Sequence, residues 1–377
     1  MFMKQDRAAP GHARFSPLLF QLSVLIRHAL LLSRRREGAK REFRTLYWPV
    51  QSTSWRLRAF ARKRFLKFAR KAISGISVPM LLAVAMPAMA QTMPGFTVTT
   101  YAEPVVGPVF LSFAPDGTLF AGRDTGPPLG SIAAAFVTRI GPGGTPIEDY
   151  GDVATPDPDP VVVDVLGLVS GVAGSVLTGG NSVSPTRGSI SAIRPNQSVV
   201  ELWTSTQWTN PSEMKFDRQG RLLFADVGSR QVWVSEAGET PTVFATLPNS
   251  RTAFHLAIAP DGRVFVGDGN GRISEYAADG SLLNVAYAQF ASRVALDFGR
   301  GCGFGRDLWV LRQASGTLHR VPAAGQIIDV GSGFTDFPYD IKFGPDAKLY
   351  LSHYTGARIS RIEADGVDCI FADRFER

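Results

Sequence analysis

Short runs in which apolar and polar residues alternate, broken by glycine-rich turns, recur along the chain from residue 95 onward. In the stretch "FHLAIAPDGRVFVGDGNGRISEY", residues 254–276, two such runs, Val264 to Val266 and Ile273 to Tyr276, flank the turn "GDGNG". Alternation turns every second side chain to the same face of a strand, and Asn-Gly tolerates the positive φ of a tight turn. The stretch therefore predicts a β-hairpin.

Near-copies of this hairpin follow one another at intervals of 40 to 57 residues. A third strand follows each copy, as in "VWVS" from Val232, and most copies add a fourth. Four short antiparallel strands in a repeat of this length are typical of a β-propeller blade. Six copies predict an all-β, six-bladed propeller. Aligned on the apolar residue that precedes the turn, the copies centre on Phe113, Ser170 (a degenerate copy), Phe216, Ile258, Phe298 and Phe343.

The two ends of the repeated region are each incomplete. The last copy reaches "ISRIEADG" at 359–366 without a fourth strand, whereas "GFTVTTYAEP" at 95–104 has no blade of its own. We expect the amino-terminal strand to complete the last blade, so that residues 95–366 form one closed ring. Closing the ring removes the open sheet edges that invite aggregation.

The repeated "PDG-x-L/V-x-V-x-D" units resemble those of NHL-repeat propellers and, more loosely, of the lactonase-like propellers in the gluconolactonase and SMP-30 group. The resemblance covers about residues 95–366. It implies a six-bladed fold and, for the lactonase group, a divalent metal held on the central axis by a Glu, two Asn and an Asp. The matching places here are "AEPVVGP" and "SEMKF", with no Asn-Gly before a core strand.

The repeat also predicts which residues lie near the central channel. The innermost strand of each blade lines that channel, and the residue three positions before the alignment residue lies near one mouth. Equal register in different blades would make Glu213, His255 and Asp340 converge there, with donors suited to Ca, Mg, Mn or Zn. The alternative is structural, with the same side chains bonded to strand ends and channel water. The six positions are Phe110, Gly167, Glu213, His255, Ala295 and Asp340.

Other polar residues near the blades admit plainer interpretations. Arg251 and Arg293 lie near the same mouth and could orient an anionic ligand, although an exposed arginine is usually a solvated one. Asp124, Asp226 and Asp268 recur after the second strand, which indicates turn capping. The segment "GRGCGFGRD" at 299–307 resembles a phosphate loop but sits inside a hairpin, so we interpret it as a lengthened turn.

The amino-terminal part of the chain differs from the rest in charge. Residues 1–90 hold 18 Lys and Arg against 3 Asp and Glu, whereas residues 91–377 hold 22 against 30. The basic pI therefore belongs to the first segment, and the body has no basic stripe of the kind that binds nucleic acid. Residues 56–90 show a basic region, an apolar stretch and Ala88-Met89-Ala90, which predict a signal peptide cleaved before Gln91. Residues 1–55 are a basic extension, consistent with a start codon assigned too far upstream.

Export would place the mature chain in an oxidising compartment, secreted or periplasmic. Its two cysteines, Cys302 and Cys369, are then candidates for one disulfide. The apolar stretch within residues 56–90 is too short to span a membrane, and we expect no stable membrane span in the mature chain. The tail, residues 367–377, contains "CIFADRFER", which resembles a short terminal motif of some exported bacterial proteins.

Two classes of function follow from these observations. The first is a secreted, monomeric NHL-type propeller that binds a protein, a glycan or a small ligand at one mouth of the channel. The second is a metal-dependent lactonase-like or esterase-like hydrolase, in which Asp340 or His255 moves the proton. Quinone-dependent sugar oxidation shares the six-bladed fold, but the sequence holds no distinctive cofactor signature. The incomplete lactonase ligand set favours binding.

Overall fold

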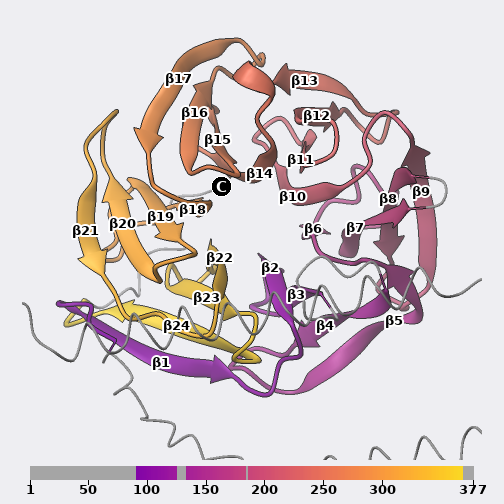
Figure 1. The fold of residues 1–377 in the computed structure, drawn as a ribbon. Coiled ribbons are helices and arrows are strands. Elements are labelled where there is room, and N and C mark those ends of the chain that lie inside the picture. Colours follow the sequence, from indigo (N-terminus) through magenta and orange to yellow (C-terminus); the bar gives the residue numbers. More distant parts are fainter. Residues whose placement is uncertain (1–90, 125–132, 184–185, 368–377) are drawn as a thin grey trace, which may run out of the picture. The chain divides into compact units, whose positions relative to one another are not determined.

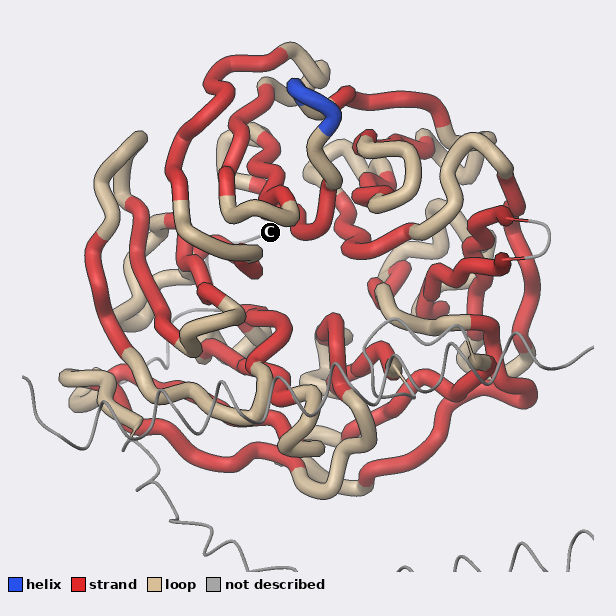
Figure 2. Tube along the Cα trace, viewed as in Figure 1, coloured by secondary structure: helices blue, strands red, loops and turns tan. Residues whose placement is uncertain are grey.

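The computed structural model describes residues 91–124, 133–183 and 186–367, which form six four-stranded antiparallel sheets arranged around a central axis (Figure 1). Strands and turns make up nearly all of this part of the chain, and η1 (Pro248–Ser250) is a single short helical turn in it (Figure 2). The all-β, six-bladed propeller that the repeats predict is confirmed.

Each blade contributes four strands, and the innermost strand comes first in the first five blades. Blade one consists of β2 (Pro108–Phe113), β3 (Leu119–Arg123), β4 (Ala134–Ile140) and β5 (Ile147–Pro156). Blade two consists of β6 (Val161–Asp164), β7 (Ser175–Val183), β8 (Thr186–Ile193) and β9 (Val199–Ser205), and blade three of β10 (Pro211–Phe216), β11 (Leu222–Asp226), β12 (Gln231–Ser235) and β13 (Thr242–Thr246).

Blade four consists of β14 (Ala253–Ile258), β15 (Val264–Asp268), β16 (Arg272–Tyr276) and β17 (Leu282–Gln289), and blade five of β18 (Val294–Phe298), β19 (Leu308–Arg312), β20 (Thr317–Val321) and β21 (Ile328–Gly331). Blade six consists of β22 (Pro338–Phe343), β23 (Leu349–His353), β24 (Arg358–Ala364) and β1 (Phe96–Ala102).

The alignment of the repeats is correct in five blades and wrong in one. Phe113, Phe216, Ile258, Phe298 and Phe343 each end an innermost strand. Ser170 instead lies between β6 and β7, and Gly167 is therefore not on the axis. The cause is a long turn in place of a tight one: the carboxylate of Asp164, which ends β6, accepts hydrogen bonds from the backbone N–H groups of residues 168, 169 and 170 at 2.8 to 3.0 Å.

The hairpin of β15 and β16 forms as its alternation predicts. Its turn closes through Gly271 N donating to Asp268 O at 3.1 Å, and Gly271 takes a positive φ of 83°. Asp268 Oδ1 also accepts from the backbone N–H groups of Asn270 and Arg272 at 2.8 and 3.0 Å. Asp226 accepts similarly from residues 209, 210 and 229. For these two aspartates the turn-capping interpretation is confirmed.

The first described strand joins the last blade. β1 pairs antiparallel with β24, from Phe96 opposite Ala364 to Ala102 opposite Ile359 (Figure 1). Beside the pair, Thr97 Oγ1 donates to Asp365 Oδ1 at 2.7 Å. β1 thus lies at the outer edge of the sheet whose inner strand is β22.

The apolar core is divided among the contacts between neighbouring blades. Residues of blades five and six share one cluster, built around Trp309, Phe304 and Phe343, and blades three and four share another around Leu223 and Tyr276. The other neighbouring pairs do the same, including blades six and one. Because a strand turns alternate side chains to opposite faces, each inner sheet can bury apolar residues against the blade on either side.

Several expectations fall outside the described residues. They concern the extension and signal peptide in residues 1–90, the tail beyond residue 367, and Cys369. Cys302 itself lies in the lengthened turn, beside Gly303. This turn is close to the last described residue, because a Cβ atom on Gly303 would stand 3.4 Å from a side-chain atom of Val367. The disulfide stays a prediction. Among the described residues, none forms a helix with the length and apolar character needed to cross a bilayer.

Candidate functional site

Three of the predicted site residues meet on the axis. Glu213, His255 and Asp340 are the third residues of β10, β14 and β22, and one ligand atom from each lies within 4.8 Å of those of the other two. His255 Nδ1 is 3.2 Å from Glu213 Oε2 and 3.8 Å from Asp340 Oδ1. Equal register in different blades therefore produces the convergence that the sequence predicts.

The three residues are buried, whereas the sequence places them at an open mouth. Glu213 is 1% exposed, and His255 and Asp340 are 0% exposed. Aromatic rings account for much of this burial, because the ring of His255 lies 5.1 Å from that of Phe110 and 6.2 Å from that of Tyr339. Position along a strand predicts the direction of a side chain, but it says nothing of the neighbours that cover it.

Backbone groups hold the two carboxylates in place. Leu256 N donates to Glu213 Oε2 at 2.7 Å, and Leu111 N donates to Asp340 Oδ2 at 2.9 Å. In both cases the donor belongs to the inner strand of an adjacent blade. The carboxylates thus join neighbouring blades at the axis as well as facing His255.

Two lysines that the sequence analysis missed neutralise Glu213. Lys342 Nζ lies 3.0 Å and Lys215 Nζ 3.4 Å from Glu213 Oε1, and Lys215 Nζ also lies 2.8 Å from Asp297 Oδ1. Lys215, Asp297 and Lys342 follow the register positions 213, 295 and 340 by two residues on the same strands. Since side chains two apart share a face of a strand, this spacing was the signal that could have identified them.

The far side of His255 fixes the position of its ring proton. Gln313 Nε2 lies 3.2 Å from His255 Nε2 and 2.5 Å from Tyr339 O, and Gln313 Oε1 accepts from Arg293 Nε. The amide nitrogen can only donate, so His255 Nε2 must accept. The proton of the neutral ring is therefore on Nδ1, the atom that faces Glu213 and Asp340.

Burial and neighbouring charges move the pKa values of this cluster in opposite directions. Burial by itself raises the pKa of Glu213, but Lys215, Lys342 and His255 outweigh it and hold that pKa well below its usual range. Burial raises the pKa of Asp340 to about 8, and nearby Glu213 adds to the effect while Lys342 opposes it. Burial also lowers the pKa of His255. At neutral pH the cluster thus holds an ionised Glu213, a neutral imidazole and a protonated Asp340.

The cluster does not suit a catalytic divalent metal. Two observations favour a metal. The types and spacing of the ligand atoms in Glu213, His255 and Asp340 match those of a metal site, and His255 Nδ1 and Asp340 Oδ1 make no hydrogen bond to any described residue. Yet a metal would need the nitrogen that here carries the proton, and Glu213 is already paired with two ammonium groups. Full burial also leaves no open position for a substrate.

The two predicted arginines are engaged by the protein. Arg251 Nη1 lies 2.7 Å from Asp268 Oδ2. The guanidinium of Arg293 lies over the rings of Phe254 and Tyr339, at 4.6 and 5.1 Å from their centroids. Arg293 is therefore part of the packing above His255, and Arg251 stabilises the capped turn at Asp268.

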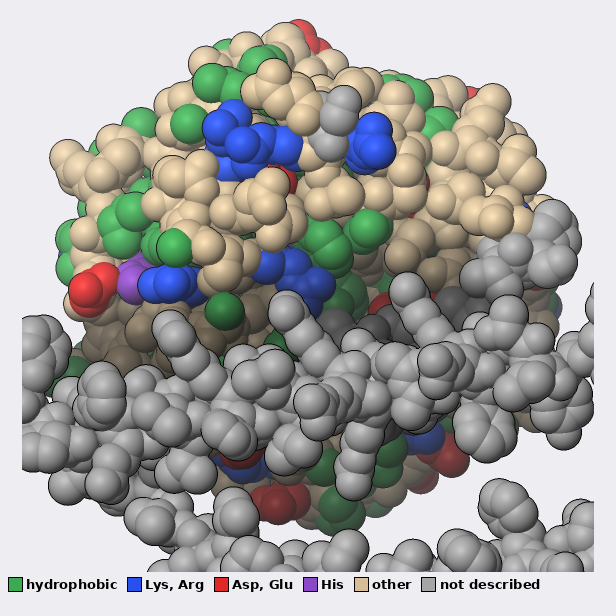
Figure 3. Space-filling view, in the orientation of Figure 1, with side chains coloured by type: hydrophobic (Ala, Val, Ile, Leu, Met, Phe, Trp, Pro, Cys, Tyr) green, Lys and Arg blue, Asp and Glu red, His purple; other side chains and the backbone are tan. Residues whose placement is uncertain are grey.

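On the face seen in Figure 3, in the part not covered by grey atoms, Lys and Arg side chains lie in small groups among uncharged ones.

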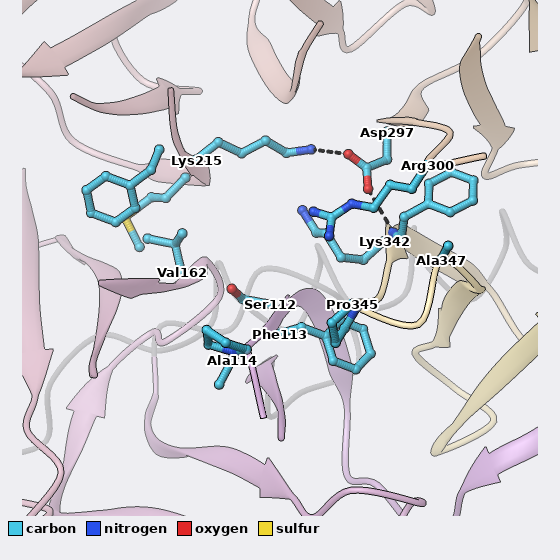
Figure 4. A pocket seen from close by; sticks show the side chains of 14 residues that line it. Ser112, Phe113, Ala114, Val162, Lys215, Asp297, Arg300, Lys342, Pro345 and Ala347 are labelled. Carbon is cyan, nitrogen blue, oxygen red and sulfur yellow. Dashed lines mark hydrogen bonds and ion pairs between the residues drawn. The ribbon is translucent and has the colours of Figure 1, made fainter. Parts of the chain in front are cut away.

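A pocket opens where the innermost strands end. Its volume is about 440 Å³, and Figure 4 shows Lys215 reaching across it toward Asp297 while Arg300 extends into its middle. Asp297 is held in turn by Phe343 N, which donates to its Oδ2 at 2.8 Å. Because Lys215 and Lys342 line this pocket and also bind Glu213, the buried cluster lies directly beneath it. We call it the basic pocket; its lining includes Ser112, Ala114, Lys215, Asp297, Arg300 and Lys342.

A second group of carboxylates lies near the start of the inner strands. Burial and the neighbouring charge of Asp124 raise the pKa of Asp157 to about 7. Burial, with the charges of Asp157 and Asp124, raises the pKa of Asp159 well above its usual range. Asp157 and Asp159 directly precede β6, whereas the basic pocket opens where the inner strands end.

Comparison with solved structures identifies the same fold in proteins of different activities. A gluconolactonase from Xanthomonas campestris matches with a TM-score of 0.55 at 14% identity, over 74% of this chain and 93% of that one. The PQQ-bound aldose sugar dehydrogenase of Streptomyces coelicolor also gives 0.55 at 14%, over 72% and 99%. A virginiamycin B lyase from Staphylococcus aureus, solved with quinupristin, gives 0.51 at 15%, over 71% and 85%.

A scan of the sequence against protein-family models gives no match, and a search of curated protein sequences gives none either. At these identities the structural matches define architecture rather than activity. The chain is a six-bladed β-propeller that shares its fold with a gluconolactonase, with sugar dehydrogenases and with a virginiamycin B lyase.

Proposed function

We propose that this protein is an exported, NHL-type binding propeller that takes a small ligand in the basic pocket at one mouth of its channel. The pocket is the observation that carries the proposal: about 440 Å³ is within the range of small-molecule sites, and charged groups converge on it from three blades. Export rests on the signal-like pattern of residues 56–90.

The arrangement of the polar groups supports binding rather than catalysis. Asp297 and Glu213 are ion-paired with Lys215 and Lys342 at 2.8 to 3.4 Å. Paired groups of this kind hold each other in fixed positions, which lowers the entropy lost when a ligand is captured. A general acid or base would instead need to be unpaired and accessible, with a pKa close to the pH at which the protein works.

The test is a fragment screen by ligand-observed NMR on the mature chain, with Ala114→Trp as the blocking variant. Ala114 lines the basic pocket, so an indole there should fill the space and remove most hits. Ala324→Trp, on the exposed turn between β20 and β21, is the matched control and should keep them. Circular dichroism and thermal melting establish that both variants are folded. Hits that persist unchanged in Ala114→Trp, or the absence of hits in the parent, would overturn the proposal.

A second candidate is a metal-dependent lactonase-like or esterase-like hydrolase. The atoms that favour it are His255 Nδ1 and Asp340 Oδ1, which lack hydrogen-bond partners among the described residues. Elemental analysis of the purified mature protein, calorimetric titration with Ca, Mg, Mn and Zn, and a screen of lactones and esters test it. We expect no stoichiometric metal. A bound metal that is lost in Asp340→Ala, together with turnover of a lactone, would establish the hydrolase instead.

A further inference from the structure

The turn between β18 and β19 is longer than its counterparts in most blades. It spans residues 299–307, whereas the matching turn of blade six spans residues 344–348 and that of blade three spans 217–221. This is the glycine-rich "GRGCGFGRD" segment, and it lies at the mouth where the inner strands end. We call it the blade-five loop.

The blade-five loop is anchored at both its middle and its end. Phe304 is 1% exposed within the apolar cluster between blades five and six, and Trp309 Nε1 donates to Phe304 O at 3.0 Å. Gly301 N donates to Gly305 O at 2.8 Å, which closes the loop on itself. Asp307 Oδ2 lies 3.3 Å from Arg320 Nε. The loop is therefore held in shape before any ligand arrives.

Two arginines of this loop point to a second pocket beside the basic pocket. The side pocket has a volume of about 740 Å³, and Arg218, Arg300 and Arg306 line it. It shares Phe216, Asp297 and Arg300 with the basic pocket, so the two form one continuous depression. Arg300 stands at the junction and reaches into the basic pocket (Figure 4).

These arginines differ from most others in the described part of the chain. Arg139, Arg221, Arg263 and Arg358 each form an ion pair at 2.8 Å or less. Arg218, Arg300 and Arg306 are exposed and have no ion-pair partner among the residues that the structure describes. Their five N–H donors apiece are thus available to a ligand.

The charge of the depression has the opposite sign to that of the body. The three arginines carry the unpaired positive charge of its lining. Lys215 and Lys342 also line it, but they are paired with Asp297 and Glu213. The two lining carboxylates are already used: Asp297 binds Lys215 at 2.8 Å, and Asp217 binds Arg221 at 2.7 Å. Residues 91–377 as a whole carry 22 basic and 30 acidic side chains. A concentration of cations within a region of net negative charge attracts and orients an anion.

We propose that the blade-five loop is an anion-recognition loop, and that the ligand is a small organic anion bearing a carboxylate or a phosphate. The proposal rests on the proposed function, because it names the chemical class of the ligand in the basic pocket. The planar fork of Arg300 binds either anion in a bidentate manner, while Arg218 and Arg306 attract it from the side pocket. The apolar part of the ligand packs against the phenylalanine rings at the strand ends.

Three aromatic probes of similar size test the inference: phenyl phosphate, benzoate and neutral benzamide. We expect the full mature chain to bind at least one anion about tenfold more tightly than benzamide in calorimetric and NMR titrations at low ionic strength. Added salt should weaken the anions and leave benzamide unchanged. Phenyl phosphate and benzoate distinguish a phosphate from a carboxylate preference.

Single substitutions locate the contact. Arg300→Gln should weaken anion binding about tenfold, and Arg306→Gln and Arg218→Gln should weaken it less, because they act from the side pocket. Arg187→Gln removes an exposed arginine on β8 that lines neither pocket, and should change nothing. If benzamide binds as tightly as the anions, or Arg300→Gln has no effect, the anion inference fails while the proposed function stands. If Ala114→Trp leaves every bound probe in place, the proposed function itself fails.

Discussion

At the scale of single residues, the centre of this propeller is an ion-paired cluster instead of an open site. Glu213 receives two ammonium groups on one oxygen and a backbone N–H on the other. Buried ion pairs gain little over apolar packing, yet losing one partner is costly because the other charge stays buried. Lys342 depends on Glu213 in this sense, since Glu213 contributes most among the nearby acids to the rise of its pKa.

Glu213→Gln should therefore destabilise the protein strongly. The amide keeps the size of the side chain but removes its charge, which leaves Lys342 and Lys215 to share Asp297. We expect a loss of about 3 to 5 kcal/mol in the free energy of unfolding measured in urea. Glu363→Gln is the control: its partners Lys348 and Arg361 are partly exposed, so the change should stay below about 1 kcal/mol. Equal effects of the two substitutions would contradict the role of the buried pair.

Asp340 makes a separate prediction about pH. Its folded pKa of about 8 lies above the value of about 4 expected in the unfolded chain. The folded state thus holds the proton more tightly, so this contribution to stability is complete below about pH 4 and is lost as pH rises through 8. Asp340→Asn cannot lose a proton. In chemical denaturation, its free energy of unfolding relative to the parent should rise between pH 5 and pH 8, by up to about 1.4 kcal/mol per pH unit, and level off above pH 8. A flat difference over this range would mean that Asp340 is already ionised in the folded protein.

At the scale of elements, the turns decide which sequence signals are informative. Four of the five correctly aligned residues predict the ends of their strands because a short turn follows and fixes the register of the hairpin. Phe298 also ends its strand, although the longer blade-five loop follows it. In blade two the alignment failed, because the carboxylate of Asp164 holds a longer turn through hydrogen bonds to backbone N–H groups. The other repeats have no matching sequence feature from which this turn could be predicted. The direction of Glu213, His255 and Asp340 followed from register, but their burial under Phe110 and Tyr339 and the positions of the lysines did not.

The glycine that ends the β15–β16 turn offers a test of this dependence. Gly271 has a φ of +83°, and a Cβ atom there would lie 2.2 Å from Ser292 O. Gly262 has a φ of +91°, but its nearest neighbour would be Ala278 Cβ at 3.6 Å. Gly262→Ala should cost about 1 to 2 kcal/mol from the backbone alone. Gly271→Ala should cost clearly more in thermal or urea unfolding, and a smaller loss than in Gly262→Ala would contradict the clash.

At the scale of the whole molecule, the apolar clusters lie between blades, so no blade can bury its own surface alone. β1 takes part in two ways: it pairs with β24, and Phe96 packs against Phe304 and Trp309, at 5.0 and 6.0 Å between ring centroids. That this strand keeps the ring closed is our prediction. Deleting residues 95–103 should expose the edge of β24 and these rings, and so lower the melting temperature and promote aggregation, as light scattering would detect. A truncated chain that stays monomeric and melts like the parent would show that the ring holds without β1.

The filled axis has a consequence for traffic through the molecule. At the level of Phe110, Glu213, His255 and Asp340, side chains from four blades touch across the centre and are buried. The central channel is therefore blocked at this level and does not run through the molecule. A molecule that enters the basic pocket must therefore leave by the same opening.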